Sequence, residues 1–507
     1  MQGTSQAGRT RSRDVGDELV MRAGDDSRAG DLVKPSGPCH DAPMTAPVVV
    51  VGGGLAGSEC SFQLASRGRP VVLYEMRPRR STPAHAGSDL AELVCSNSLR
   101  SDDPHHAAGL LKREMERFDS LIIAAARRNA VPAGGALAVD RAAFAADITE
   151  AIESHPGIEL RREELTTLPA ARECDCVIAT GPLTSEALEQ QIEALIGTDH
   201  LYFYDAIAPI VTGDSLDHDR LFRASRYGKG GDDYLNCPLD ETEYRTFHRE
   251  LLEANTIELR DFERPLFFEG CLPIEELARR GEDTLRFGPM KPVGLRTPAG
   301  NRPHAVVQLR QEDLARSQYN LVGFQSRMTW PEQRRVLRTL PGLERARFVR
   351  YGQVHRNTFI NAPLHLDRWY RFARQPHLRL AGQLTGVEGY LESAATGLVV
   401  ALYLTLQAGD RQPPPLPDTT ALGALARHLT ESNPKRYQPT NINYGLLDPL
   451  RERVPRRDRR AAYVARAQRA LNAWLDSMDL AGTIPWRPPF SKPGPEERSS
   501  ATARSPS

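Results

Sequence analysis

The sequence lacks any apolar segment long enough to cross a membrane. Its best apolar run, GLVVALYLTL at 397–406, spans ten residues, whereas a transmembrane helix needs about 20. The first 43 residues are rich in Gly, Arg, Asp and Ser and have no apolar core of the kind that a secretory signal needs. We therefore expect a soluble protein in which residues 1–43 form a disordered extension, with Met44 as the natural start.

Cysteine is scarce and irregularly placed. The seven cysteines are an odd number without a repeated spacing, so we expect no disulfide framework and a reducing, cytoplasmic location. Cys174 and Cys176 are separated by one residue, and no second pair completes a zinc site. His105 and His106 have no third ligand at a usable spacing. The sequence predicts no metal centre.

Neither sign of charge is in excess, since 65 basic and 65 acidic residues cancel. Overall charge thus neither predicts nor excludes a polyanionic partner, and any nucleic-acid surface must be local. Residues 334–350 and 451–460 each hold six arginines. Each stretch is either a solvated helix face or a phosphate-contacting surface.

The order of patterns predicts an α/β fold with a discontinuous first domain. APVVVVGGGLAG at 46–57 is typical of a buried strand and a glycine turn, followed by a helix and a second strand, PVVLYE at 70–75. Such a β-α-β unit implies a parallel sheet. A later strand, turn and apolar helix at 377–404 return the chain to this domain.

The predicted domain boundaries follow from shifts in composition. Turns and aromatic residues become frequent from residue 201, which indicates an inserted domain. The tail is rich in Pro, Ser and Arg and is expected to be disordered. We predict a Rossmann-like domain at 44–200 and 345–480, an inserted α/β domain at 201–344 and a tail at 481–507.

The glycine turn carries a nucleotide fingerprint. Gly52, Gly54 and Gly57 form G-x-G-x-x-G between a strand and a helix; they allow a tight turn, close phosphate approach and close helix packing. Ser61, Gly68 and Val71 continue the pattern, and Glu75 stands where it can accept hydrogen bonds from a ribose. A glycine turn without a ligand is the other interpretation. FAD, NAD and S-adenosylmethionine fit the motif alone, and the late return at 381–397 favours FAD.

Several further blocks resemble one family, the folate- and FAD-dependent tRNA (uracil-5-)-methyltransferases of the TrmFO or Gid type. They run in order from about residue 44 to 450 and include LVCSNSLRSDD (93–103), GGALAVDR (134–141), SRYGKGG (225–231), FEGCLPIEE (268–276), RFGPMKPVGL (286–295), AGQLTGVEGYLESAATG (381–397) and TNINYGLLDPL (440–450).

The resemblance implies an FAD domain of the glutathione-reductase type with an insertion. It implies methylation of C5 of a T-loop uridine (position 54) in tRNA, with methylenetetrahydrofolate as carbon donor and reduced FAD as reductant. NADPH or NADH would supply the electrons. A homodimer is compatible with the resemblance. The cofactor-binding residues it implies, together with the glycine pattern, are Gly52, Gly53, Gly54, Leu55, Ala56, Gly57, Glu75, Gly382, Gln383 and Gly386.

Cys271 is the predicted nucleophile. C5 of uracil becomes reactive when a thiolate adds at C6, so the chemistry needs an activated cysteine. Cys271 precedes LPIEEL, which can begin a short helix whose amides favour a thiolate, although Glu269 and Glu275 oppose it. From the residues alone, a buried structural thiol is the alternative. The resemblance implies that Cys271 adds to the base.

Cys95 is the second predicted catalytic residue. It lies in LVCSNSLRS, whose polar side chains would be costly in a core without partners. The other interpretation is an ordinary polar loop whose hydrogen-bonding groups all have partners. The resemblance implies that Cys95 assists the methylene group or removes the C5 proton.

Three further residues are predicted at the substrate. Tyr390 either stacks on a bound ring or is an ordinary core aromatic. Arg226 and Lys229 could contact phosphate or the folate tail. Three alternative functions stay open: the same chemistry on ribosomal RNA, a related flavoprotein that modifies a wobble uridine, and a flavin-containing RNA-binding protein without turnover.

Overall fold

The computed structural model describes residues 46–478, except 83, 172, 198–199, 229, 258–271 and 408–411. The predicted extension and tail, Met44, Lys229 and Cys271 therefore lie outside the described residues. Within the described ranges, no helix has the length and apolar character needed to cross a membrane.

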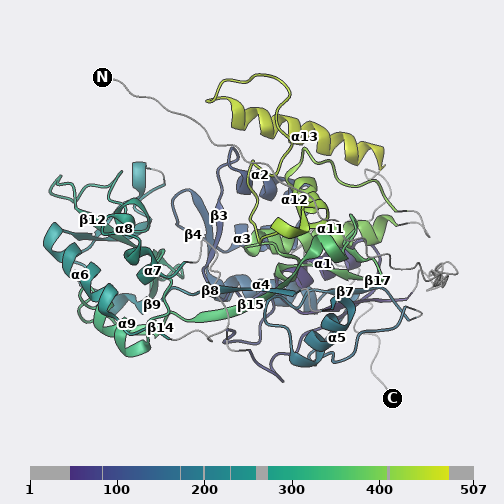
Figure 1. Cartoon of the computed structure of the whole chain (residues 1–507), viewed down its shortest axis with the longest axis horizontal. Helices are drawn as coiled ribbons and strands as arrows, with labels where there is room; N and C mark the ends of the chain where they lie inside the picture. The colour runs from purple at the N-terminus through teal and green to yellow at the C-terminus, as the bar shows by residue number, and fades with distance from the viewer. Residues whose placement is uncertain are drawn as a thin grey trace, which may run out of the picture. The chain divides into compact units, whose positions relative to one another are not determined.

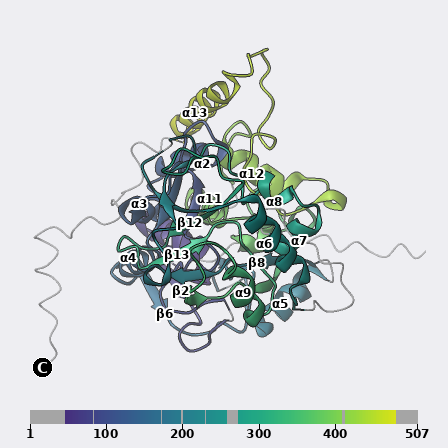
Figure 2. The same ribbon diagram turned by 90° about the vertical axis from the view of Figure 1, so that its left-hand side faces the viewer.

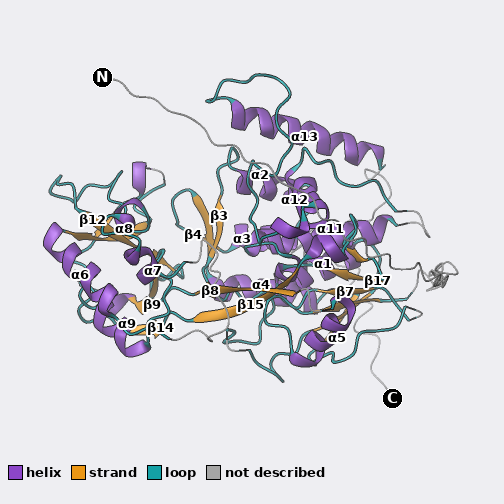
Figure 3. Cartoon of the chain, viewed as in Figure 1, coloured by secondary structure: helices purple, strands orange, loops and turns teal. Residues whose placement is uncertain are grey.

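The first sheet is mostly parallel, and the glycine turn follows its strand β1; Figure 3 shows two of its strands, β7 and β17, in orange among helices. Its strand order is β6, β2, β1, β7, β17, β16, and β16 alone runs antiparallel to its neighbour. The strands are β1 (Val48–Val51), β2 (Val71–Tyr74), β6 (Ile158–Arg161), β7 (Cys176–Ile178), β16 (Arg371–Phe372) and β17 (Gln375–Leu380). The predicted parallel α/β sheet is thus confirmed, and a strand from the late part of the chain joins it.

Two helices pack tightly on this sheet, α1 (Leu55–Ser66) and α11 (Tyr390–Leu406), as Figure 1 shows. Every residue of α1 is buried. The helices touch at a glycine, because a Cβ on Gly397 would lie 2.1 Å from the Ala56 carbonyl oxygen. The apolar run read from the sequence therefore forms a buried helix beside the glycine turn.

The second sheet is antiparallel and has its own hydrophobic core. Its order is β10, β11, β12, β13, β9, β14. The strands are β9 (Ile210–Thr212), β10 (Phe222–Arg223), β11 (Tyr234–Leu239), β12 (Ala305–Gln311), β13 (Gln318–Leu321) and β14 (Phe348–Arg350). The helices are α6 (Glu241–Glu253), α7 (Ile274–Arg279), α8 (Thr284–Phe287) and α9 (Trp330–Leu337). Since β14 follows residue 344, this sheet extends past the predicted end of the insertion; the domain boundaries stay a prediction.

A ribbon of two strands connects the two sheets. β8 (His200–Ala206) leads the chain into the segment that forms the second sheet, and β15 (Val354–Ile360) leads it back out. The two strands pair antiparallel along their full lengths. A small third sheet, formed by β4 (Ala130–Val131), β3 (Ser98–Ser101) and β5 (Ala136–Val139), has the order β3, β5, β4. The chain therefore passes between the sheets at one place, next to the Cys95 loop that precedes β3.

The remaining helices surround the first sheet. Figure 2 shows α13 (Arg459–Ser477) beside α2 (Ala107–Glu116), where the Phe118 and Trp474 rings meet edge to face with centroids 6.4 Å apart. The others are α3 (Leu121–Arg128), α4 (Arg141–Glu153), α5 (Glu186–Ile196), α10 (Ala362–His365) and α12 (Ala421–Glu431).

Candidate active site

The glycine turn between β1 and α1 has the shape of a phosphate cradle. Gly52 has φ +103°, and a Cβ there would lie 2.6 Å from the Ala179 carbonyl oxygen. A Cβ on Gly57 would lie 1.8 Å from the Gly52 oxygen, whereas one on Gly54 would meet no atom within 4 Å. Gly52 and Gly57 are thus required by packing, and Gly54 faces open space where a ligand can approach the backbone.

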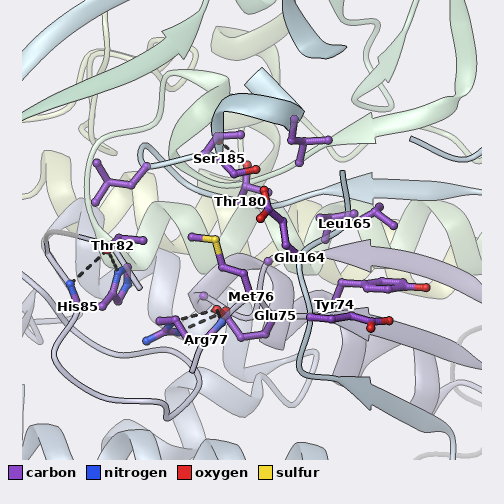
Figure 4. Close-up of a pocket in the computed structure, with 17 residues that line it drawn as sticks. Tyr74, Glu75, Met76, Arg77, Thr82, His85, Glu164, Leu165, Thr180 and Ser185 are labelled. Atoms are coloured by element: carbon purple, nitrogen blue, oxygen red, sulfur yellow. Dashed lines mark hydrogen bonds and ion pairs between the residues drawn. The ribbon is translucent and has the colours of Figure 1, made fainter. Parts of the chain in front are cut away.

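A cavity opens at the carboxyl ends of β1, β2 and β7, which is where open parallel sheets bind ligands. Figure 4 shows Glu75, Arg77, Glu164, Thr180 and Ser185 around it. These side chains come from three separate strand ends and the loops that follow them. The cavity adjoins Gly52 and Gly54, so one elongated ligand can contact both the turn and the end of β2.

Glu75 is charged and held in place. Its Oε2 accepts from the Gly53 amide at 2.9 Å, and its Oε1 accepts from Arg77 Nε at 3.0 Å. Burial alone would raise the pKa of Glu75, but the hydrogen bonds and charge of Arg77 outweigh it and hold the pKa below its usual value. The ionised carboxylate can accept further hydrogen bonds, as a ribose diol requires.

These features fit a dinucleotide such as FAD. The open space at Gly54 admits a pyrophosphate, the start of α1 presents backbone amides to it, and Glu75 lies at the end of the neighbouring strand. Leu55 and Ala56 begin α1 and are buried beneath the turn. The predicted residues of this part of the site therefore lie together.

The late glycine segment also adjoins the turn, but its amides are already used. The Gly382 amide donates to Thr396 Oγ1 at 2.7 Å, and the Gly386 amide donates to the Gln383 carbonyl at 2.9 Å. In this structure both amides therefore bond within the protein. Both glycines have positive φ, +80° and +89°, which accounts for their identity. Cofactor contact by Gly382, Gln383 and Gly386 stays a prediction.

Cys95 differs from the other described cysteines in its exposure. Cys60, Cys174, Cys176 and Cys237 are buried, whereas Cys95 is partly exposed. Burial raises the pKa of each of those four thiols. Among the residues that the structure describes, Cys95 is therefore the thiol open to a substrate.

Tyr390 holds the Cys95 loop against the start of α11. Its hydroxyl accepts from the Cys95 amide at 2.6 Å and from the Ser96 amide at 3.1 Å. Burial raises the pKa of Tyr390 well above its usual value, so the phenol stays neutral. The structure thus gives Tyr390 a role as loop anchor that neither sequence interpretation included.

Glu392 joins three distant segments at the same place. Its buried carboxylate accepts from Arg100 at 2.6 Å and from the Ile442 amide at 2.9 Å. Arg100 belongs to LVCSNSLRS and Ile442 to TNINYG, so blocks that lie far apart in the sequence meet at the first turn of α11.

Arginines surround the Cys95 loop on its other side. The Cys95 carbonyl accepts from Arg141 Nη2 at 3.4 Å and from Arg350 Nη2 at 3.3 Å. Ser96 Oγ accepts from Arg310 Nη2 at 3.4 Å. Arg141 and Arg310 were not among the predicted site residues, and Arg350 was named only within the arginine-rich stretch 334–350. Sequence features could have pointed to two of the three. Arg310 is a charged residue in the otherwise uncharged strand β12, and Arg350 is the last arginine of the arginine-rich stretch 334–350.

Arg226 is already engaged within the protein. Its Nε donates to Gln308 Oε1 at 2.7 Å, and its Nη1 donates to the Lys291 carbonyl. Burial lowers its pKa. These contacts join SRYGKGG to the RFGPMKPVGL loop, so Arg226 braces two predicted substrate loops. Its contact with phosphate or folate stays a prediction.

The described residues also bear on the surroundings of Cys271. The predicted short helix after it is confirmed as α7, which begins at Ile274. Glu275 is fully buried, its Oε1 accepts from the Arg327 amide at 2.7 Å, and burial raises its pKa. Glu275 is therefore tied to the Arg327 backbone inside the second sheet's domain.

Replacing Tyr390 by Phe is expected to destabilise the protein by about 1–3 kcal/mol, because the Cys95 and Ser96 amides lose their shared acceptor. Urea unfolding followed by circular dichroism measures this change. Tyr444→Phe is the matched control, since that hydroxyl donates to an exposed carbonyl of His105. Equal effects of the two substitutions would contradict the anchoring role.

The chain is similar to a family of known proteins over most of its length. Residues 47–412 match the family model described as glucose inhibited division protein A. A protein of Geobacter sulfurreducens named methylenetetrahydrofolate-tRNA-(uracil-5-)-methyltransferase TrmFO is 56% identical over 434 residues, covering 85% of this chain and 99% of the relative. A protein of the same name from Natranaerobius thermophilus is 53% identical over 430 residues, covering 85% and 99%.

Solved structures agree on the fold. GidA of Aquifex aeolicus, in its form II crystal, superposes with a TM-score of 0.60 at 15% identity, covering 85% of this chain and 74% of that one. The form I crystal gives 0.60 at 14% identity, with coverage of 86% and 77%. At this identity the likeness concerns the fold alone.

Proposed function

Because this chain belongs to the methylenetetrahydrofolate-tRNA-(uracil-5-)-methyltransferase family, we propose that it methylates a T-loop uridine (position 54) of tRNA at C5. It is an FAD-dependent enzyme that takes its carbon from methylenetetrahydrofolate. The observation that carries this proposal is the 56% identity to a relative over 99% of the relative's length. NADPH or NADH as the source of electrons, assembly as a homodimer and a cytoplasmic location are parts of the proposal.

The cradle and the thiol loop are proposed to share one cofactor. When bound, FAD supplies the reducing chemistry that converts the transferred methylene group into a methyl group. Gly54 leaves room for the pyrophosphate and Glu75 offers a charged acceptor to the ribose. Tyr390 and Glu392 fix the Cys95 loop and the start of α11 beside the late glycine segment.

Two thiols are proposed to carry the covalent chemistry. The Cys271 thiolate adds to C6 of uracil, which makes C5 nucleophilic toward the methylene carbon. When C5 attacks the methylene carbon, loss of the C5 proton and cleavage of the bond from that carbon to the folate nitrogen leave an exocyclic methylene group. Hydride, which reduced FAD would supply, then completes the methyl group as the carbon–sulfur bond breaks and Cys271 leaves as thiolate. Cys95 is proposed to assist the one-carbon transfer or to remove that proton; its partial exposure and the contacts of its loop support this.

A hollow beside α7 and α8 offers a place for RNA to bind next to Leu272. It has a volume of about 760 Å³ and is lined by Leu272, Phe287 and Gln325 among others. Leu272 is bonded directly to Cys271, and the Phe287 ring is 82% exposed. An exposed aromatic ring beside a hollow is typical of surfaces that stack on unpaired bases.

The test is an incubation of purified protein with an unmodified tRNA transcript, labelled methylenetetrahydrofolate and NADPH. We expect label in 5-methyluridine, found by nucleoside mass analysis and mapped to the T loop. A transcript with cytidine at the target position serves as the control and should stay unlabelled. Label in ribosomal RNA instead, or in a wobble uridine, would replace the proposed substrate by one of the alternatives.

A further inference from the structure

Three arginines that belong to three different elements form a cluster beside Cys95. Arg141 is the first residue of α4, Arg310 lies in β12, and Arg350 ends β14. Their positions come from strong local structure, because Asp140 caps α4 through the Ala143 amide at 3.1 Å and β12 is a central strand. The cluster is therefore a built feature at the junction of the two sheets.

The cluster holds more positive charge than its carboxylate can neutralise. Glu312 forms an ion pair with Arg141 Nε, and it is the carboxylate whose charge acts on all three guanidinium groups. Among the described residues, three guanidinium groups and this one carboxylate leave an excess of positive charge in a place where Arg310 is 7% exposed. Because uncompensated charge is costly to bury, this arrangement calls for an anion.

Several N–H groups of the cluster have no acceptor. The Nε atoms of Arg310 and Arg350 are buried and have no hydrogen-bond partner among the described residues. Arg350 donates to the Cys95 carbonyl through Nη2, although a guanidinium carries five N–H donors. Burial lowers the pKa of Arg310 and of Arg350, but arginine still stays charged at neutral pH. Arg141 already donates through Nε, Nη1 and Nη2, to Glu312, Leu93 and Cys95, so the donors without an acceptor belong to Arg310 and Arg350.

We propose that Arg141, Arg310 and Arg350 bind a phosphodiester group of the tRNA next to the reacting uridine. The proposal rests on the proposed function and adds a substrate contact to it. Guanidinium groups bind phosphate oxygens through paired hydrogen bonds, and such contacts set the position of a nucleic acid rather than read its bases.

The position of the cluster favours phosphate over the carboxylates of folate. The cluster contacts the backbone of Cys95, a thiol proposed to act on the reacting base. The phosphates that flank a nucleotide are one sugar away from its base, whereas the carboxylates of folate are separated from the reactive pteridine by an aminobenzoyl group. An anion site so near the reacting atoms therefore suits the RNA backbone.

The test measures binding of an unmodified tRNA transcript to the FAD-loaded protein by fluorescence anisotropy over a range of salt concentrations. Arg310→Gln and Arg350→Gln are each expected to raise the Kd about tenfold. Each should also lower the slope of log Kd against log salt by about 0.7–0.9, the change expected for one lost phosphate contact. Arg245→Gln is the matched control: its side chain is 65% exposed and pairs with Glu241, so both quantities should stay as in the unchanged protein.

Separate measurements distinguish the other outcomes. Calorimetric titration with tetrahydrofolate tests the rival anion: weaker folate binding with unchanged tRNA binding would overturn the proposal. Slower turnover with unchanged binding of both substrates would also overturn it, since the arginines would then act only on the Cys95 loop. If Arg310→Gln does not fold, Arg350→Gln, at a partly exposed position, decides the result by itself.

The tRNA-binding measurement and the methylation assay together separate this proposal from the proposed function. Suppose that the glutamine variants bind tRNA more weakly and with a lower salt slope, but the unchanged protein forms no 5-methyluridine. The phosphate site then stands and the methylation proposal fails. If the unchanged protein forms 5-methyluridine and the glutamine variants bind tRNA as tightly as it does, the phosphate site alone fails.

Discussion

Replacing Cys271 by Ala is expected to abolish formation of 5-methyluridine, with turnover at least about 1,000-fold lower, while the protein keeps its FAD. The reason is chemical: without a nucleophile at C6, C5 of uracil cannot attack the methylene carbon, and no other group supplies that covalent step. Product is measured by nucleoside mass analysis, and bound FAD by its visible absorption.

Cys174→Ala is the matched control for this substitution. Cys174 is 7% exposed, and burial raises its pKa, so its thiol is not available to a substrate. We expect its removal to leave turnover within about twofold. Unchanged turnover in the Cys271→Ala protein would refute the nucleophile, and loss of FAD from that protein would show that Cys271 supports the fold instead.

Replacing Gly54 by Val is expected to yield a folded protein that has lost at least about nine-tenths of its FAD. A Cβ at this position meets no atom of the chain within 4 Å, and Gly54 has φ −74°, which any residue adopts. The added methyl groups would instead occupy the space through which a pyrophosphate approaches the turn. Absorption of the purified protein gives the FAD content, and circular dichroism reports the fold.

Gly135→Val is the matched control for Gly54→Val. A Cβ on Gly135 also meets nothing within 4 Å, and this glycine lies in an exposed turn away from the cradle. We expect full FAD content in this protein. If Gly54→Val also retains its FAD, the cofactor does not approach the turn as proposed. If the Gly54→Val protein unfolds, residue 54 is a glycine because folding requires it, and not because a cofactor approaches the open space beside it.

The parts of the site that the sequence predicted well are those made by neighbouring residues. The spacing of Gly52, Gly54 and Gly57 describes one strand, one turn and one helix, so the cradle could be predicted from about twenty residues. Glu75 is further along the chain but belongs to the adjacent strand of the same β-α-β unit, which places it beside Gly53. Short-range geometry is strongly constrained by backbone sterics and hydrogen bonding.

The parts that sequence reasoning missed depend on contacts across more than two hundred residues. Arg310 and Arg350 reach the Cys95 loop from the second sheet; the sequence marks both as unusual charges but does not place either beside that loop. The interpretation of Tyr390 as a stacking or core ring missed its hydroxyl contact with the Cys95 loop for the same reason. The predicted end of the insertion, 344, stays a prediction, although β14 continues the second sheet to Arg350.

The sequence by itself therefore determined the α/β class and, through the resemblance of its motifs, the family; cofactor contact at the glycine turn and catalysis by the two thiols stay predictions. Only the tertiary structure decided which thiol among the described residues is accessible, what anchors its loop and how much positive charge gathers beside it. The physical reason is that a motif specifies its own local backbone, whereas burial and electrostatic balance depend on every segment that folds against it.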